Sequence, residues 1–219
     1  FTHGVASGDP LKDRVILWTR VIPGDGLDRG LDVEWQVAAD KGFAKVTSSG
    51  HFFTDASRDF TVKVDASSLE PGRQYFYRFI SKGEVSPTGV TRTLPVGEVA
   101  RFRIGIASCS NYPQGFFNAY RDMASQDLDA VVHLGDYIYE YPDGGYANKE
   151  ALERLNRHVR PEHEILTLED YRTRYGVYRT DQDLQKLHQK HPFICVWDDH
   201  ELTNNTWKAC LLYTSDAAD

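Results

Sequence analysis

Residues 1 to about 95 alternate between hydrophobic and polar positions in the manner of β-strands. Apolar side chains lie two residues apart in four segments, at residues 15–21, 33–37, 60–64 and 75–79. Turn-forming Gly and Pro residues lie between these segments, and none of the segments shows the period of a helix. Several short strands at this spacing predict an all-β sandwich of the immunoglobulin or fibronectin kind.

A turn followed by tyrosines supports this interpretation. Residues 69–77 read Leu-Glu-Pro-Gly-Arg-Gln-Tyr-Phe-Tyr, with the turn at Pro71 and Gly72. In related sandwiches, a Tyr after such a turn hydrogen-bonds back to the chain and fixes a connection between the sheets. We therefore expect a tyrosine of this segment to make such a bond. Residues 88–98 are predicted to be an exit strand and linker, so we place the sandwich at residues 1–97.

From residue 98 onward the pattern changes to short apolar strands that alternate with helices. A strand, a helix and a strand within about 35 residues form a βαβ unit, which implies a parallel sheet with crossover helices. Residues 98–209 are therefore predicted to be an incomplete α/β domain. The predicted strands cover residues 102–107, 129–134 and 192–197, and the predicted helices cover residues 114–125, 168–178 and 181–189.

Each predicted strand of this second half ends in a cluster of polar side chains. The clusters lie at residues 108–111, 135–140 and 198–201. Because the carboxyl ends of parallel strands line one crevice of an open α/β sheet, we expect side chains of the three clusters to meet. Carboxylate, imidazole, phenol and thiol groups gathered at one crevice form a set of metal ligands. The sequence therefore predicts a metal site at this edge of the sheet.

Several motifs resemble those of the PhoD family of alkaline phosphatases and phosphodiesterases. Phe-Thr-His-Gly-Val-Ala-Ser-Gly-Asp-Pro at 1–10 and Leu-Trp-Thr-Arg at 17–20 are similar to the opening of the PhoD N-terminal domain. Three further segments resemble metallophosphatase motifs of the same family: Ala-Ser-Cys-Ser at 107–110, His-Leu-Gly-Asp-Tyr-Ile-Tyr-Glu at 133–140 and Trp-Asp-Asp-His-Glu at 197–201. The resemblance implies a PhoD N-terminal immunoglobulin-like domain, followed by the first part of a calcineurin-like metallophosphatase domain. The later ligand motifs of that fold are absent from residues 1–219.

The resemblance implies a role for five residues. Asp136 would bridge two metal ions, Tyr139 would bind iron as a phenolate, and Cys109 would be a thiolate ligand of the same ion. Asp199 would bind the second metal, and His200 would act as the acid for the departing alkoxide. Iron and calcium are the implied cofactors, and other divalent metals suit such ligands. A phenol with a pKa of about 10 ionises at neutral pH only beside a strong positive charge, which agrees with this assignment.

The implied activity is the hydrolysis of phosphate monoesters and diesters by a hydroxide that two or more metal ions activate. Two alternatives stay open: a phosphodiesterase similar to the phospholipase D members of the family, and a non-catalytic extracellular binding module. The resemblance further implies a monomer that is secreted, periplasmic or associated with the cell wall. No leader is visible at the start of the sequence, so either it has been removed or residue 1 is the edge of a fragment. Because the later motifs are absent, we expect residues 1–219 alone to be inactive.

Composition narrows the range of partners. Lys and Arg number 25 against 32 Asp and Glu, which gives a formal charge of -7. This balance argues against nucleic acid as the main partner, because phosphate backbones select basic surfaces. No apolar run approaches the ~20 residues of a transmembrane helix.

Two sets of residues in the helical region have superficially functional spacings. His158 with His163, and His188 with His191, are spaced like metal ligands, but we predict that they lie in exposed helical stretches and bind no metal. The basic run at residues 154–160 is predicted to be a solvated face.

The last ten residues form a separate problem. Residues 210–219 read Cys-Leu-Leu-Tyr-Thr-Ser-Asp-Ala-Ala-Asp, which resembles the translated adapter of a transposon-based sequencing library. We therefore leave this segment out of the fold prediction. We also expect the natural protein to continue well beyond Lys208.

Overall fold

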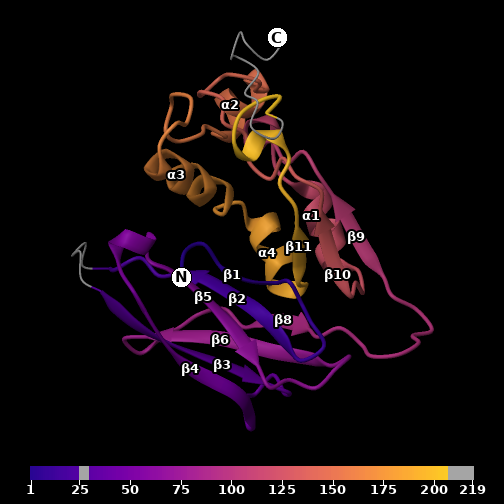
Figure 1. Ribbon diagram of the computed structural model, residues 1–219. Coiled ribbons are helices and arrows are strands. Elements are labelled where there is room, and N and C mark those ends of the chain that lie inside the picture. Colours follow the sequence, from indigo (N-terminus) through magenta and orange to yellow (C-terminus); the bar gives the residue numbers. More distant parts are fainter. Residues whose placement is uncertain (25–29, 207–219) are drawn as a thin grey trace, which may run out of the picture. The chain divides into compact units, whose positions relative to one another are not determined.

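The computed structural model describes residues 1–24 and 30–206 (Figure 1). Two compact units are present, and each contains several stretches of the sequence. The first unit contains residues 1–105, 119–131 and 182–194, and the second contains residues 106–118, 132–181 and 195–206. The boundary near residue 97 between the predicted domains stays a prediction. The adapter-like segment 210–219 lies outside the described residues.

Strands and helices occur where the sequence pattern predicts them, with shifted bounds, while β1, β4, β7 and α2 were not predicted. The strands are β1 Val5–Gly8, β2 Arg14–Arg20, β3 Leu31–Ala38, β4 Val46–Thr54, β5 Thr61–Ser67, β6 Gln74–Ser81, β7 Glu84–Val85, β8 Gly89–Arg92, β9 Ile104–Ala107, β10 Ala130–His133 and β11 Phe193–Cys195. The helices are α1 Asn118–Ser125, α2 Lys149–Leu155, α3 Leu168–Tyr178 and α4 Gln182–Lys190, with short 3-10 turns η1 Ala56–Arg58, η2 Tyr112–Gln114 and η3 Asp199–Glu201. One sheet has the order β5-β2-β1-β11-β10-β9, and the other has the order β4-β3-β6-β7 with β8 also paired to β6.

The N-terminal part is a β-sandwich with alternating core positions. In β2, Val15, Leu17 and Thr19 are fully buried, while Ile16 and Trp18 between them are partly exposed. The hydroxyl of Tyr75 accepts the backbone N–H of Glu70 at 2.8 Å, which is the tyrosine bond that the sequence predicts. Side chains of both sheets contribute to the core, among them Val33, Val37, Val62, Val64, Ala66, Tyr77 and Phe79.

Strands β9, β10 and β11 run parallel to one another. The Leu134 amide donates to the Ala107 carbonyl at 2.8 Å, and the Val196 amide donates to the His133 carbonyl at 3.0 Å. Further backbone hydrogen bonds join the opposite ends of the β9–β10 and β10–β11 pairs. In each pair, the residue numbers of the bonded partners increase together along the two strands, which is the pattern of parallel pairing. The βαβ unit β9-α1-β10 is therefore present, and a β-sandwich followed by an α/β region is confirmed. The residues that follow these strands emerge at one edge of the sheet.

Helix α3 begins where its sequence predicts. The Thr167 hydroxyl accepts the Asp170 amide at 3.2 Å, and the Asp170 carboxylate accepts the Thr167 amide at 2.9 Å. This reciprocal pair satisfies two N–H groups that the first turn of a helix leaves without partners.

Two predictions about the helical region are wrong. Arg157 is buried instead of solvated, and its guanidinium forms an ion pair with the buried carboxylate of Asp181 at 2.8 Å. His188 and His191 are buried instead of exposed, and the His188 ring stacks on Phe193 with centroids 3.8 Å apart. Polar composition suggested exposure, but partners from other segments cover these side chains.

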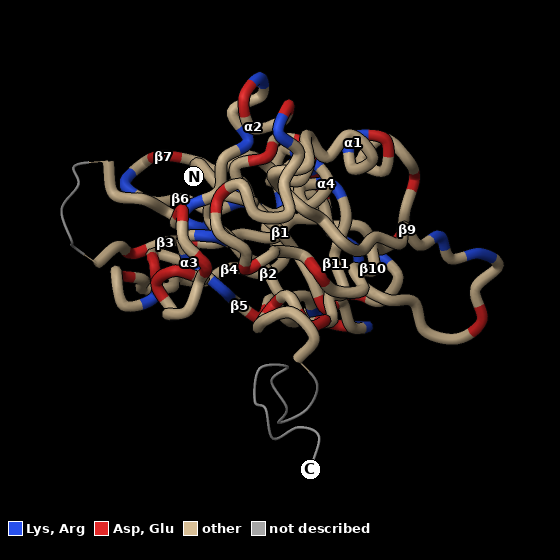
Figure 2. The backbone as a smooth tube through the Cα atoms, turned by 90° about the horizontal axis from the view of Figure 1, so that it is seen from above, with Lys and Arg blue, Asp and Glu red and all other residues tan. Residues whose placement is uncertain are grey.

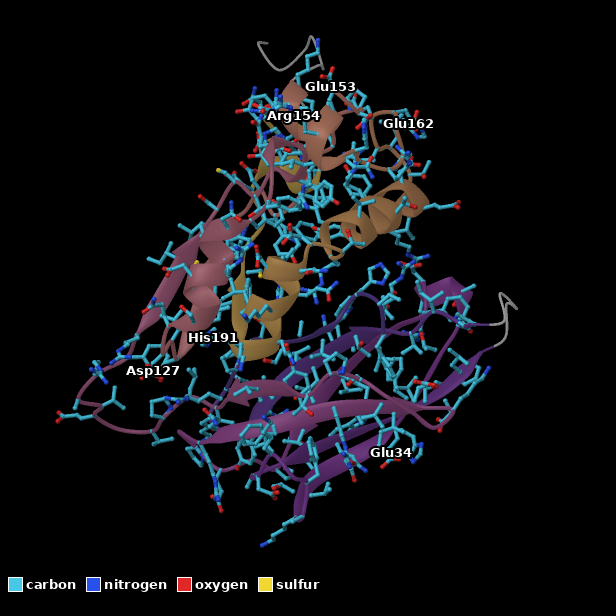
Figure 3. All side chains as sticks on the ribbon, turned by 180° about the vertical axis from the view of Figure 1, so that it is seen from behind. Glu34, Asp127, Glu153, Arg154, Glu162 and His191 are labelled. Atoms are coloured by element: carbon cyan, nitrogen blue, oxygen red, sulfur yellow. The ribbon has the colours of Figure 1, made fainter. Side chains whose placement is uncertain are left out.

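Arg154, at the start of the same basic run, is solvated as predicted. It lies next to Glu153 in α2 (Figure 3) and pairs with Glu150 at 2.6 Å across one helical turn. Figure 2 shows acidic and basic positions interspersed along the chain. In the part of the chain that the structure describes, no helix has the length and hydropathy needed to cross a membrane.

Candidate metal centre

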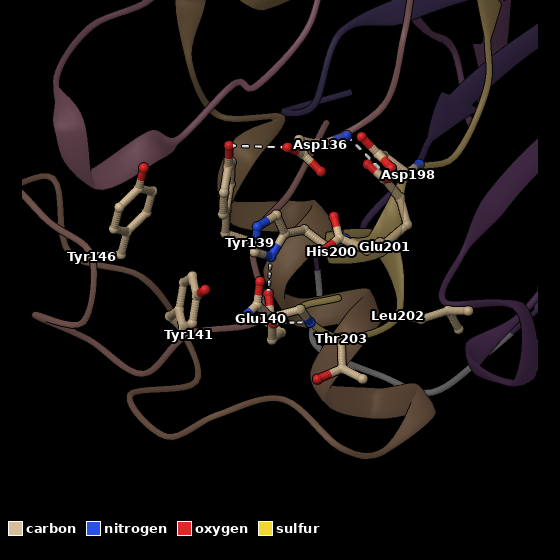
Figure 4. Close-up of polar contacts among 12 residues, drawn as sticks. Asp136, Tyr139, Glu140, Tyr141, Tyr146, Asp198, His200, Glu201, Leu202 and Thr203 are labelled. Carbon is tan, nitrogen blue, oxygen red and sulfur yellow. Dashed lines mark hydrogen bonds and ion pairs between the residues drawn. The ribbon is translucent and has the colours of Figure 1, made fainter. Parts of the chain in front are cut away.

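The loops that follow β9 and β10 bring Cys109, Asp136 and Tyr139 together. The Cys109 Sγ lies 3.4 Å from Oδ2 of Asp136. The Tyr139 hydroxyl lies 3.3 Å from the same oxygen, as the dashed line between Tyr139 and Asp136 in Figure 4 marks. Cys109 and Asp136 have φ angles of 57° and 54°, in the left-handed region that side chains rarely adopt. Bonds from the Cys109 amide to the Gly135 carbonyl (3.1 Å) and from the Ser110 amide to the Asp136 carbonyl (2.8 Å) hold this backbone. Strained backbone of this kind clusters at functional sites.

Gly135 and Glu201 connect the end of β10 to the segment after β11. A Cβ at Gly135, where φ is 103°, would lie 2.4 Å from the Cβ of Asp198, so only glycine allows this approach. The buried Glu201 carboxylate accepts the Asp136 amide at 3.1 Å and the Asp198 amide at 2.7 Å. Glu201 therefore links the backbone of Asp136 to the backbone of Asp198, directly before η3.

The turn η3 supplies the two remaining predicted residues. Ligand atoms of Asp136, Asp199 and His200 all lie within 4.8 Å of one another, the one such group of His, Cys or carboxylate residues found among the described residues. The His200 Nδ1 donates to the fully buried carboxylate of Glu140 at 2.7 Å, which leaves Nε2 for a ligand or for proton transfer. The Tyr139 ring lies 4.3 Å from the imidazole, centroid to centroid. The five predicted site residues thus converge, while their roles stay predictions.

The cluster has the electrostatic character of a cation site. The Oδ1 atom of Asp136 is buried and has no hydrogen-bond partner, which is unfavourable for a carboxylate unless a cation satisfies it. Burial, with the neighbouring Asp136 and Cys109, raises the pKa of Tyr139 well above its usual value. The phenolate form therefore requires a cation beside it. We conclude that the residues present fit a metal ion.

A buried histidine bonds to the segment that carries Cys109. His133 is completely buried, and its Nε2 lies 2.9 Å from the hydroxyl of Ser110, next to Cys109. Burial lowers the pKa of His133 to about 4.

This shifted pKa predicts a loss of stability on acidification. Between pH 6.5 and pH 4 the unfolded chain binds a proton at His133 that the folded chain does not bind, so acid favours unfolding. At pH 5, His133 alone is expected to lower the free energy of unfolding by about 2 kcal/mol relative to pH 7. Urea denaturation at both pH values measures it, and His133→Gln is expected to show a correspondingly smaller pH dependence. An equal pH dependence in the two proteins would contradict this account.

Three supporting residues were not predicted from the sequence. Arg174 is 1% exposed, and its guanidinium donates to the carbonyls of Tyr139 and Tyr141, which fixes the loop that carries the site. Glu140 and Glu201 stand inside the recognised motifs but received no role. The sequence held a signal for both residues. Each is a carboxylate shortly after a predicted buried strand, and a carboxylate that becomes buried there needs a hydrogen-bond or ion-pair partner. Arg174 lies in a polar helix, where no local signal marks it.

Comparisons with known proteins agree with this geometry. A family profile described as PhoD-like phosphatase matches residues 104–215, and one described as PhoD-like phosphatase, N-terminal domain, matches residues 1–95. The chain is 43% identical over 212 residues to alkaline phosphatase D of Bacillus subtilis (strain 168), covering 94% of this chain and 36% of that protein. A solved structure described as "Structure of PhoD" matches with a TM-score of 0.87 and 43% identity, covering 94% of this chain and 40% of that one. The chain therefore spans little more than a third of the length of this curated relative.

Proposed function

Because the chain belongs to the PhoD-like phosphatase family, we propose that the complete protein is a metal-dependent hydrolase of phosphate esters. The observation that carries this proposal is the convergence of Cys109, Asp136, Tyr139, Asp199 and His200 at one edge of a parallel sheet. The chain covers 36% of its curated relative, so the activity is proposed for the complete protein and not for residues 1–219 alone.

The proposed metals are iron and calcium. A thiolate at Cys109 and a phenolate at Tyr139 suit iron, while the carboxylate of Asp199 suits calcium or another hard cation. Asp136 is proposed to bridge them, because its Oδ2 faces Cys109 and Tyr139 while its buried Oδ1 has no other partner. When bound, the metals supply positive charge that offsets the charge of the phosphoryl oxygens and favours the ionisation of water.

His200 is proposed as the proton donor to the departing oxygen. Its Nδ1–H points at Glu140, so the proton available to a substrate is carried on Nε2. The Glu140 carboxylate also accepts the Asn204 amide at 2.6 Å, which fixes the carboxylate and therefore the orientation of the imidazole. The chain thus holds a proton donor within the same cluster as the proposed metal ligands.

Further properties of the complete protein follow from the family. We propose that it acts on monoesters and diesters, works as a monomer, and is secreted, periplasmic or associated with the cell wall. No feature of the described residues favours the phospholipase D-like or binding-module alternatives.

Metal analysis and turnover test the proposed function. The complete protein is expected to purify with iron and calcium, to hydrolyse p-nitrophenyl phosphate and bis-p-nitrophenyl phosphate, to lose both activities on chelation, and to regain them when the metals return. Cys109→Ser is expected to lower the iron content, because a hydroxyl is a poorer ligand than a thiolate. A metal-free protein without turnover would instead favour a binding module.

A further inference from the structure

An exposed aromatic side chain stands beside the candidate metal centre. Tyr146 is 65% exposed, and its ring centroid lies 5.8 Å from that of Tyr139 and 5.7 Å from that of Tyr141. Tyr141 in turn lies 5.4 Å from the His200 ring. Figure 4 shows the three tyrosines on one side of His200. Tyr139, Tyr141 and Tyr146 are called the aromatic wall below, and it runs from a buried site residue to the solvent.

The backbone of Tyr146 is fixed in an unfavourable conformation. Its φ is 50°, in the left-handed region that bulky side chains avoid. The side-chain amides of Asn111 and Gln114 both donate to the Tyr146 carbonyl, at 2.9 Å and 3.0 Å. Asn111 lies two residues after Cys109, so the segment that carries the thiol also holds Tyr146.

These observations point to a ligand rather than to packing. A strained residue persists when its surroundings hold it in place, and such residues cluster at ligand sites. A large ring that is fixed and mostly exposed contributes little to a core, but it offers a ready surface at low entropic cost. The neighbouring residues supply the polar chemistry for a phosphoryl group, and the aromatic wall supplies a flat surface next to it.

We propose that the aromatic wall, through Tyr146, binds a planar aromatic substituent of the phosphate ester by stacking. This inference rests on the proposed function, because it requires the phosphoryl group to lie at the candidate metal centre. The ester oxygen then lies near His200, and an aryl group or a nucleobase lies against Tyr146. Stacking between two aromatic rings is expected to lower Kd about three- to tenfold relative to a ligand without the ring.

Two phosphonates that cannot be hydrolysed test this inference. Isothermal titration of the complete, metal-loaded protein compares phenylphosphonate with methylphosphonate, which differ only in the substituent. We expect phenylphosphonate to bind more tightly, and we expect Tyr146→Leu to lower this preference about three- to tenfold. Tyr146→Phe, which retains the ring, is expected to keep the preference. Phe53→Leu in β4, at a position 63% exposed, is the matched control and is expected to change neither Kd.

The outcomes separate this inference from the function on which it rests. An unchanged preference in Tyr146→Leu, or equal weakening of both phosphonates, overturns the role of the aromatic wall while phosphate binding stands. No binding of either phosphonate by the wild-type protein overturns the proposed function and this inference together. A thymidine phosphonate distinguishes the two sources of an aromatic group. Tighter binding than phenylphosphonate, with the same loss in Tyr146→Leu, identifies a nucleobase, and weaker binding identifies a simple aryl group.

Discussion

Replacing Asp136 with Asn is expected to remove the bound metals and to lower kcat/KM of the complete protein by on the order of 10³-fold. The Oδ2 of Asp136 contacts both Cys109 and Tyr139, and the carboxylate also belongs to the cluster with Asp199 and His200. An amide has nearly the same shape but carries no charge, so it cannot balance the charge of the proposed metal ions. Metal content and turnover of p-nitrophenyl phosphate measure the two effects.

The control for this substitution is a carboxylate outside the site. Asp127 has a side chain that is 72% exposed and pairs with Arg103 at 2.8 Å. Asp127→Asn is expected to keep full metal content and activity, because exposed ion pairs contribute little to stability. Full metal content and activity in Asp136→Asn would falsify the assignment of the metal centre.

Replacing His200 with Ala is expected to have an effect that depends on the leaving group. Esters of ordinary alcohols need a proton at the departing oxygen, so their kcat is expected to fall by about 10²- to 10⁴-fold. Esters of p-nitrophenol release p-nitrophenolate, a stable anion that needs no proton, so their kcat is expected to fall far less. Turnover of an alkyl and a p-nitrophenyl phosphate by the same variant measures the difference.

Glu140 and an unrelated histidine complete this test. Glu140→Gln is expected to lower the activity on alkyl esters by about 10- to 100-fold, because residues that orient a functional side chain typically have effects of this size. His51, which pairs with Asp32 at 2.7 Å on the exposed side of the sandwich, is the control, and His51→Ala is expected to change neither activity. A uniform loss on both kinds of ester in His200→Ala would show that His200 does not act as the proton donor.

Much of the fold follows from local patterns in the sequence. Alternation at residues 15–21 and 75–79 predicts strands of the sandwich, and Pro71-Gly72 before Tyr75 predicts the tyrosine bond. Periodicity is a property of neighbouring residues, so it can be recognised without knowing which segments pack together. Bounds differ by a few residues, as for the strand predicted at 192–197 and found at Phe193–Cys195, because ladder bonds determine where a strand ends.

The sequence by itself determined most of the strands and the βαβ unit, and it predicted the five residues that converge at the candidate site, because strand-end positions and recognised motifs are readable along the chain. Only the tertiary structure decided which buried groups support them. Glu140 meets His200 across 60 residues, and Glu201 meets Asp136 across 65 residues. Tertiary packing also buried Arg157 and left Tyr146 exposed. Pairing between segments so far apart depends on how the chain packs, and local periodicity holds no record of it.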